Sequence, residues 1–499
     1  MSDARDAVVV GGSVAGMLTA VALAQRGARV TVLERDASPL PESPDAAFDA
    51  WDRRGSPQRS HSHAFLARLH NLLAEHVPAL LDSLLEHGAE RMRFSDLAGS
   101  LGDATGTVPE DEELVLLACR RITFEWCLRR YAAALPGLEW RRGAAVQELR
   151  ADAGVPPRVT GVVCDDGATL EAPLIVDATG RRSRSATWLE AAGITPPQLE
   201  RSPCGIFYAS RFYRVREGAE APKLEGPIGA DLGFLKYGIF PGDDRVFSIT
   251  LAASPDDPEL RTLVRPGSFD ALAAWLPATR DWVDPAVSVP VSDVSAMAKL
   301  ENRRRFPVSE GTPVALGMAW VGDALLHTNP IVGRGCTFAA INAFLVADAW
   351  EAHPDAGAAF ALELDAAVER ELVPWYEEVR NQDRNAIEVA ARLRSGEDPY
   401  QVHRPDGSVD PKGYMRSLVR EGFVPALRED VGVLRTFLRI FNLLESPQDL
   451  MRNPAVFAKV LEVYGRRESR DDVLRGPDRA AVVARLAEGP DAPAERLAG

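Results

Sequence analysis

Residues 7–35 read AVVVGGSVAGMLTAVALAQRGARVTVLER, and this stretch decides the fold of the chain. The β-branched run at 7–10 predicts a buried parallel strand that leads directly into a glycine-rich turn. A helix is expected from 17 to 26, Gly27 stands where the glycine after a helix belongs, and 28–33 predicts a second strand. Strand, glycine-rich turn, helix and strand in this order are typical of the β-α-β unit that binds a dinucleotide.

The turn and the end of the second strand have defined tasks in such a site. Gly11 permits the tight turn, and Gly16 lets the helix pack closely on the strand. The N-terminus of the helix offers free N–H groups and a partial positive charge to a pyrophosphate. Glu34 is placed to accept hydrogen bonds from the adenosine ribose, and Ser13 replaces the middle glycine of the pattern. The residues expected to bind the dinucleotide here are Gly11, Ser13, Val14, Ala15, Gly16, Glu34 and Arg35.

The composition is that of an ordinary globular protein and narrows the class of ligand. With 499 residues the chain is expected to form more than one packed unit. The net charge of −15 argues against nucleic acid, since a phosphate backbone binds to a basic face. The five cysteines are widely spread without a C-x-x-C pair, so we expect neither a metal site nor a disulfide framework. A secretory signal and a long apolar run are both missing from the sequence, so the expectation is a cytoplasmic protein without a membrane span.

Two later motifs favour FAD over NAD as the dinucleotide. Residues 173–181 (PLIVDATGR) predict a buried strand that ends in a turn, and residues 319–324 (AWVGDA) predict another strand that ends in Gly-Asp. The loop 329–335 (NPIVGRG) follows, and a helix with apolar residues at helical spacing is expected from 337 to 350.

This set of motifs resembles the flavoprotein monooxygenases with the para-hydroxybenzoate hydroxylase fold. The resemblance implies an α/β protein, α+β in parts. It has a Rossmann-like FAD-binding domain, an inserted antiparallel β-sheet domain that binds substrate, and a helical C-terminal region. The implied boundaries are 1–198 and 311–360 for the two parts of the FAD-binding domain, 199–310 for the inserted sheet and 361–499 for the helical region.

The resemblance also implies roles for the second Gly-Asp motif and the loop after it. Asp323 is the implied ligand of the ribityl chain, and the loop runs beside the isoalloxazine. The following helix is aimed at the pyrimidine end of the ring, where a helix N-terminus stabilises the negative charge of reduced flavin. Cys336 is expected to be a small packing residue, and His327 either contacts FAD or substrate or is a hydrogen-bonded loop histidine. The residues expected to line the flavin are His327, Pro330, Gly333, Gly335 and Cys336.

Two further segments resemble those of bacterial epoxidases of polyether antibiotic assembly. The segment 118–121 (ACRR) precedes an expected helix, and the resemblance makes Arg121 a ligand of FAD. Residues 55–63 (GSPQRSHSH) correspond to a P-Q-x-R-H-x-H pattern near the flavin, but Ser60 occupies the arginine position. Arg59, His61 and His63 therefore remain open, as loop polar groups or as site residues.

Residues 205–215, 233–240 and 245–252 are expected to be strands of the inserted sheet. A Pro-Gly-Asp-Asp turn between the last two predicts a hairpin. The sheet is expected to close over the flavin, and its aromatic residues are candidates for the substrate cavity, although each could equally belong to the sheet core. These candidates are Phe207, Tyr208, Phe212, Phe234 and Tyr237.

The resemblance implies an FAD-dependent monooxygenase that inserts one oxygen atom, by epoxidation or hydroxylation, through a flavin C4a-hydroperoxide. The implied substrate is an apolar small molecule or secondary metabolite. No catalytic side chain is singled out, because the flavin carries the chemistry. A second dinucleotide fingerprint is missing from the sequence, so the electron source is either transiently bound NAD(P)H or a partner flavin reductase.

Three other functions share part of the pattern. An FAD-dependent alkene reductase or dehydrogenase of the geranylgeranyl reductase type has the same D-A-T-G and Gly-Asp motifs and remains the alternative. A flavin-dependent halogenase is disfavoured, because none of the nine tryptophans forms a W-x-W segment. A flavoprotein without catalytic activity is disfavoured by the complete flavin loop.

Overall fold

The computed structural model describes residues 6–51, 53, 55–99, 101, 107–224, 229–469 and 476–488. The predicted β-α-β unit is present at the N-terminal end of these residues. Strand β1 (Asp6–Val10) pairs in parallel with β2 (Arg29–Glu34), and helix α1 (Val14–Gln25) connects them. Helix α1 begins three residues before the predicted start, because the backbone turns into the helix directly after Ser13.

A five-stranded parallel sheet brings the three predicted motifs together. Its strand order is β20-β9-β1-β2-β5, with β20 at Met318–Trp320, β9 at Leu174–Asp177 and β5 at Leu138–Arg142. In a parallel sheet the carboxyl ends of neighbouring strands meet at one edge. The glycine-rich turn, the D-A-T-G motif and the Gly-Asp motif therefore lie side by side.

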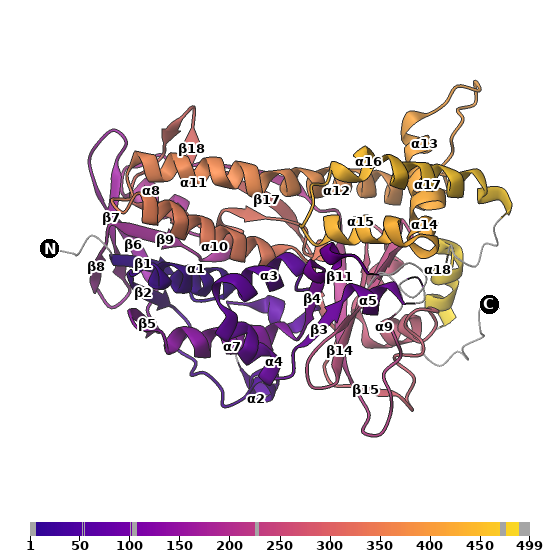
Figure 1. Ribbon diagram of the computed structural model, residues 1–499, viewed down its shortest axis with the longest axis horizontal. Helices are drawn as coiled ribbons and strands as arrows, with labels where there is room; N and C mark the ends of the chain where they lie inside the picture. The colour runs from indigo at the N-terminus through magenta and orange to yellow at the C-terminus, as the bar shows by residue number, and fades with distance from the viewer. Residues whose placement is uncertain are drawn as a thin grey trace.

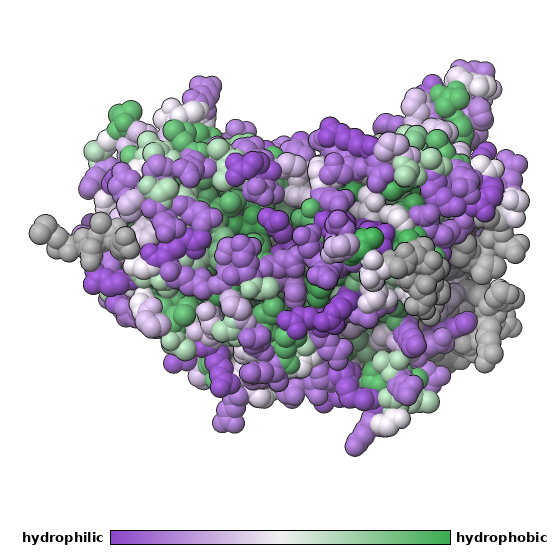
Figure 2. Space-filling view, viewed as in Figure 1, coloured by the Kyte–Doolittle hydropathy of each residue, from purple (hydrophilic) through white to green (hydrophobic). Residues whose placement is uncertain are grey.

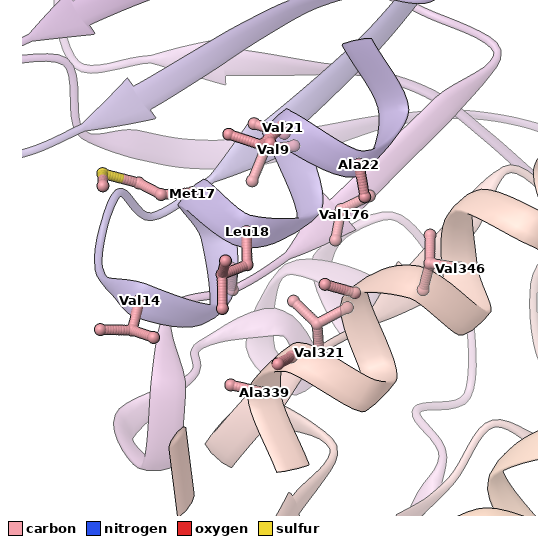
Figure 3. Close-up of a cluster of buried hydrophobic side chains, with 14 of the residues drawn as sticks. Val9, Val14, Met17, Leu18, Val21, Ala22, Val176, Val321, Ala339 and Val346 are labelled. Atoms are coloured by element: carbon pink, nitrogen blue, oxygen red, sulfur yellow. The ribbon is translucent and has the colours of Figure 1, made fainter. Parts of the chain in front are cut away.

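Helix α10 (Gly335–Ala352) packs along α1 over this sheet. It is apolar on almost every side because both of its faces are covered, which is the expected pattern for a buried helix. Figure 3 shows Leu18 and Ala22 of α1 on the side that faces Val346 of α10. On the face in Figure 2 most side chains are hydrophilic, and apolar ones gather over α10, between α11 (Ala358–Glu371) and α3 (Ala67–His76).

The inserted unit is an antiparallel sheet with two different faces. The predicted hairpin is formed by β13 (Leu235–Pro241) and β14 (Val246–Ala253), and β14 also pairs with β11 (Phe207–Val215). One face packs in a core with α9 (Pro266–Ala273), while the alternate residues of β11 and β14 face the FAD-binding domain. The sheet is completed by β12 (Gly229–Asp231), β15 (Ser288–Pro290) and β16 (Ser295–Met297).

Smaller elements complete the first two units. A three-stranded sheet of β10 (Gln198–Pro203), β17 (Glu301–Phe306) and β21 (Leu326–His327) joins the inserted sheet to the FAD-binding domain. The other small sheets are β6 (Val146–Asp152), β7 (Arg158–Cys164) and β8 (Thr169–Glu171); β3 (Glu90–Arg93) and β4 (Val115–Ala118); and β18 (Val308–Ser309) and β19 (Thr312–Pro313). The other helices of this part are α2 (Pro44–Ala50), α4 (Pro78–Glu86), α5 (Phe94–Ala98), α7 (Arg121–Ala133) and α8 (Ser185–Ala191).

The C-terminal helices run across both units (Figure 1). The helical region implied from 361 onward begins with two helices, α11 and α12 (Val373–Arg394). The chain bends at Leu372, and Pro374 lies in the first turn of α12. Helix α18 (Arg479–Glu488) returns to the inserted sheet, where Val482 is fully buried in its core. The helices between them are α13 (Pro411–Leu418), α14 (Val424–Glu429), α15 (Val431–Phe441), α16 (Asp449–Arg452) and α17 (Pro454–Gly465). Among the described helices, none has both the length and the apolar character needed to cross a membrane.

A buried ion pair fixes the inserted sheet to the FAD-binding domain. The backbone N–H and Nε of Arg120 donate to the Asp243 carboxylate at 2.6 and 3.0 Å, and the Thr123 hydroxyl donates to it at 2.7 Å. The side chains of Arg120 and Asp243 are only 2% and 1% exposed. The outer end of the guanidinium donates to Asp45 at 2.7 Å. The β13–β14 turn is thereby tied to the start of α7.

Replacing Asp243 by Ala removes the buried carboxylate and leaves the Arg120 guanidinium inadequately paired. We expect the free energy of unfolding to fall by about 3 kcal/mol, the scale found when one partner of a buried ion pair is removed. Urea denaturation followed by circular dichroism measures this. Asp244→Asn is the matched control, because Asp244 pairs with Arg214 where both side chains are more than 40% exposed, and a change of about 0.5 kcal/mol or less is expected. Equal losses in the two variants contradict the role of the pair.

Candidate functional site

The glycine-rich turn has room for a ligand but not for side chains. A Cβ on Gly16 lies 1.9 Å from the carbonyl oxygen of Gly11, and Gly11 itself has a φ of 103°. Glycine is therefore required at both positions. Ser13 is the N-cap of α1 but makes no capping hydrogen bond, and the first turn holds no acidic residue. The positive end of the helix, with the N–H groups of Val14 and its neighbours, is left for an anion.

Glu34 lies at the end of β2, against this turn. Its Oε2 accepts from the backbone N–H of Gly12 at 3.1 Å, and its Oε1 accepts from that of Asp36 at 2.9 Å. Arg53 and Arg129 approach the same carboxylate at 3.5 and 3.6 Å. A buried carboxylate held in this way keeps its orientation, as a residue that recognises ribose hydroxyls must.

A buried cluster of charges supports Glu34 from behind. Glu125 is fully buried and accepts from Arg53 at 2.6 Å. Burial opposes ionisation of Glu125, but the guanidinium groups around it, that of Arg53 foremost, outweigh burial and lower its pKa. Arg129 lies over the rings of Trp51 and Trp140, at 4.8 and 4.7 Å from their centroids.

Arg121 connects the first motif with the last one. Its Nη2 donates to Ser13 Oγ at 3.3 Å and its Nη1 to Cys336 Sγ at 3.1 Å. These two partners stand at the starts of α1 and α10, so one guanidinium spans both helix N-termini. Its Nε is buried without a hydrogen-bond partner among the described residues. The thiol of Cys336 is buried, and burial raises its pKa, so the protonated form is favoured.

The Gly-Asp motif adjoins the first helix. A Cβ on Gly322 lies 2.6 Å from that of Ala15, so this turn also requires glycine. Asp323 Oδ1 lies 3.3 Å from His327 Nδ1. Burial opposes ionisation of Asp323, but His327 and nearby arginines outweigh it, so the Asp323 pKa is lowered. His327 Nε2 is buried and has no hydrogen-bond partner among the described residues.

The loop after this motif is held from its outer side by α12. The side chains of Asn302 and Asn329 both donate to the Asp383 carboxylate at 2.7 Å. Pro330 starts a short 3₁₀ turn that ends at Gly333, where φ is 68°. Helix α10 follows from Gly335, again without a capping side chain or an acidic residue in its first turn. The loop therefore presents a second bare helix N-terminus beside the first.

These features fit FAD. Two uncapped helix N-termini and the unpartnered Arg121 Nε can meet the negative charge of a pyrophosphate and of a reduced ring. The unpartnered His327 Nε2 and the ionised Asp323 can meet hydroxyl and ring nitrogen groups. Such buried polar atoms are costly unless a ligand satisfies them.

The structure divides the aromatic candidates of the inserted sheet between its two faces. Phe212 lines a small, partly open cavity between the sheet and the FAD-binding domain. Tyr208 lies on the same face and meets the His61 ring edge-on at 4.8 Å. Phe207 and Phe234 lie in the core of the opposite face, and Tyr237 packs against that core. Alternation along the strands separates these residues, and aromatic character alone does not reveal it.

The segment 55–63, for which the sequence leaves the roles of Arg59, His61 and His63 undecided, lies at this cavity. His61 and His63 both line it. Burial, with a contribution from Arg181, lowers the His61 pKa to about 4, so this ring is neutral at pH 7. Arg59 is half-buried and its side chain has no hydrogen bond to the described residues, while Arg35 is exposed beside Gly55.

Four site residues escaped the sequence analysis: Ser210, Phe240, Ser248 and Thr250. Phe240 and Ser248 line the cavity, and the three hydroxyl residues are buried on the same face of the sheet. A signal for two of them, Ser248 and Thr250, exists in the strand 246–253 (VFSITLAA), where these polar residues alternate with apolar ones. This period of two predicts a polar face on a buried strand.

The comparisons with known proteins agree with this geometry. The family described as "FAD binding domain" matches residues 4–201. This match covers about two fifths of the chain and supports an FAD-dependent oxidoreductase. "Protein Rv3254" of Mycobacterium tuberculosis is 28% identical to it over 463 residues, which are 88% of this chain and 90% of that protein. The fold class and the cofactor FAD predicted from the sequence are thereby confirmed.

Two solved structures show the extent of the fold. PqsL, a probable FAD-dependent monooxygenase from Pseudomonas aeruginosa, aligns with a TM-score of 0.56 at 16% identity, over 79% of this chain and 98% of that chain. The flavin-dependent brominase Bmp2 aligns with a TM-score of 0.56 at 17% identity, over 92% of this chain and 99% of that chain. The same fold therefore carries more than one reaction, and the site has to decide between them.

Arg121→Ala is expected to weaken FAD binding, because it removes the guanidinium that spans both helix N-termini. The dissociation constant is expected to rise about 10- to 100-fold, the range for losing hydrogen bonds to a charged group. Titration of the apoprotein with FAD, followed by flavin fluorescence, measures it. Arg150→Ala, on an exposed strand position, is the control and leaves the affinity unchanged. An Arg121→Ala protein that is folded and binds FAD normally contradicts this role.

His61 is expected to make the protein less stable in acid. Between pH 6.5 and about 4 the unfolded chain takes up a proton on this ring that the folded protein excludes, so stability falls as the pH falls. The difference corresponds to about 3 kcal/mol by pH 4. Urea denaturation of the FAD-bound protein at several pH values measures it. We expect His61→Asn, which keeps a donor for Ser210, to show a smaller loss, and His403→Asn at an exposed position to behave like the original protein. Equal pH profiles for all three proteins count against a buried neutral His61.

Proposed function

We propose that this protein is a monooxygenase that inserts one oxygen atom into an apolar, uncharged small molecule, by epoxidation or hydroxylation. The observation that carries the proposal is the cavity between the inserted sheet and the segment 119–121. Its wall includes aromatic side chains, Phe212 and Phe240, and its floor includes Arg121, which also contacts the start of α10. A substrate in this cavity is held beside the residues that are expected to surround the flavin.

The proposed ligands of FAD follow from the two bare helix ends. The turn Gly11–Gly16 and Arg121 bind the pyrophosphate, and Glu34 binds the adenosine ribose. Asp323 binds the ribityl chain, and the loop up to Gly335 lies along the ring. FAD, when bound and reduced, supplies the electrons and the oxygen chemistry.

The protein contributes positioning, charge balance and exclusion of water. The guanidinium of Arg120 at the cavity is already balanced by Asp243 and Asp45, so it does not call for an anionic substrate. His61 is neutral at pH 7. Arg121, the other arginine that lines the cavity, is assigned to FAD in this proposal. With Arg120 paired and His61 neutral, the lining favours an uncharged substrate. Enclosure of the site by the sheet limits the loss of oxygen as hydrogen peroxide.

The proposal includes a source of electrons, either NAD(P)H that binds transiently or a partner flavin reductase. A halogenase activity like that of the brominase Bmp2 is not proposed, because none of the tryptophans forms the W-x-W segment expected of flavin-dependent halogenases. The alkene reductase or dehydrogenase is the outcome to be distinguished by experiment.

The test follows the fate of oxygen in the FAD-bound protein. NADH, NADPH or a flavin reductase supplies electrons under ¹⁸O₂, with a panel of aryl alkenes and phenols as acceptors. We expect an acceptor that occupies the cavity to raise oxygen uptake, to lower the hydrogen peroxide formed per NAD(P)H, and to carry one ¹⁸O atom in the product. Products that are hydrogenated or desaturated without label, formed without oxygen uptake, overturn the proposal in favour of the reductase or dehydrogenase.

A further inference from the structure

A continuous chain of hydroxyl groups connects His61 with Ser248, and both residues line the cavity. His61 Nδ1 lies 3.3 Å from Ser210 Oγ, which lies 2.8 Å from Thr250 Oγ1. Thr250 donates to Ser62 at 2.8 Å, and Ser62 donates to Ser248 at 2.7 Å. Ser210, Ser248 and Thr250 come from neighbouring positions of β11 and β14. His61 and Ser62 come from the segment 55–63.

The number of protons fixes the direction of this chain. A hydroxyl group has one proton to donate, and that of Thr250 is used toward Ser62. Ser210 must therefore donate to Thr250, and it accepts in turn from His61 Nδ1–H. The imidazole N–H and the hydroxyl protons of Ser210, Thr250 and Ser62 then all point the same way, toward Ser248. Bonds aligned in one direction polarise one another.

Ser248 is the end of the chain. Its Oγ accepts from Ser62. Among the described residues of the protein, none accepts a hydrogen bond from the Ser248 hydroxyl proton. The residue is only 2% exposed and lines the cavity together with Phe212 and Phe240. A buried hydroxyl donor without an acceptor is costly, and the cavity is the place from which an acceptor can come.

The start of the chain keeps this direction stable. His61 is 4% exposed and its pKa of about 4 leaves it neutral at pH 7, with one nitrogen carrying a proton. The proton must stand on Nδ1, because that nitrogen faces Ser210, whose own proton is already engaged. A neutral imidazole at one end and an unused O–H at the other make an uncharged donor.

We propose that the Ser248 hydroxyl determines specificity by donating a hydrogen bond to a carbonyl-type oxygen of an aromatic or conjugated substrate. A carboxylate is a poorer match, because Arg120 beside it is already paired with Asp243 and Asp45. The aromatic wall contacts the ring of the substrate, and Ser248 fixes which of its ends points into the sheet. The inference rests on the proposed function only for the use of this cavity by substrate.

A purely structural role for the chain makes a different prediction. If the hydroxyls served only to tie the segment 61–63 to the sheet, their loss would weaken all ligands equally or lower stability. A specificity role instead changes the ratio between ligands that differ in one acceptor atom. Acetophenone and α-methylstyrene form such a pair, since a carbonyl oxygen in the first replaces a CH₂ group of equal shape in the second.

The experiment measures the dissociation constants of both compounds for the protein with oxidised FAD bound and no reductant, from changes in the flavin spectrum. We expect Ser248→Ala to shift the ratio of the two constants about tenfold toward the alkene, the upper range for one hydrogen bond. Thr250→Val breaks the chain further back and is expected to shift it about threefold. Thr262→Val is the control, because its hydroxyl bonds to the Glu259 carbonyl outside the cavity and the ratio remains unchanged.

FAD binding and the circular dichroism spectrum of each variant show that the comparison is made between folded proteins. The proposal is overturned if the ratio of the two dissociation constants is unchanged in both Ser248→Ala and Thr250→Val. It is also overturned if the unmodified protein binds FAD but neither acetophenone nor α-methylstyrene. Because no oxygen chemistry takes place under these conditions, failure of the monooxygenase proposal leaves this result intact, and the converse also holds.

Discussion

The N-termini of two helices without capping side chains both contact Arg121, and the other site residues lie around this contact. Helices α1 and α10 pack together, and the Arg121 guanidinium reaches Ser13 at the start of one and Cys336 at the start of the other. Two positive helix ends and a guanidinium repel one another in a buried place. The protein places Asp323 near them. In the proposed complex, the anionic dinucleotide supplies the remaining negative charge. The contact between Gly16 and Gly11 that lets α1 come so close is therefore a requirement of the ligand as well as of the fold.

At the proposed adenosine end of the site, buried charged residues behind Glu34 hold its carboxylate in place. For its proposed contact with the adenosine ribose, Glu34 has to be held in one orientation although it is buried. A cluster in which Arg53 and Arg129 face Glu34 and Glu125 holds it there. Such clusters contribute little net stability, since the cost of desolvation offsets the attraction. Their value lies in orientation. The rings of Trp51 and Trp140 hold Arg129 from its faces, so the carboxylate it meets cannot rotate freely.

The sequence was most informative where a short segment performs a task alone. The strand and turn at 7–16 predict the β-α-β unit, and residues 319–324 predict a strand that ends in Gly-Asp, both of which the structure shows. It was least informative where a residue acts through partners far along the chain. Nothing near Asn329 predicts that Asp383 holds it, and nothing near Val482 predicts that this residue completes the core of the inserted sheet. These contacts depend on where the C-terminal helices return, which local pattern does not determine.

The inserted sheet uses its alternation to serve two purposes with the same strands. In β14, Ile249 and Leu251 belong to the core, while Ser248 and Thr250 belong to the hydroxyl chain. An aromatic residue can stand on either side, which is why aromatic character alone did not separate the cavity from the core. Hydroxyl residues on a fully buried strand carry more information, because each must find a partner once water is removed. Ser210 and Thr250 bond to each other, and the segment 61–63 supplies the other partners of this face. The polar face is therefore completed where the two domains meet. The surface between the two domains thus buries these hydroxyls, and it is also where the proposed hydrogen bond from Ser248 to substrate would form.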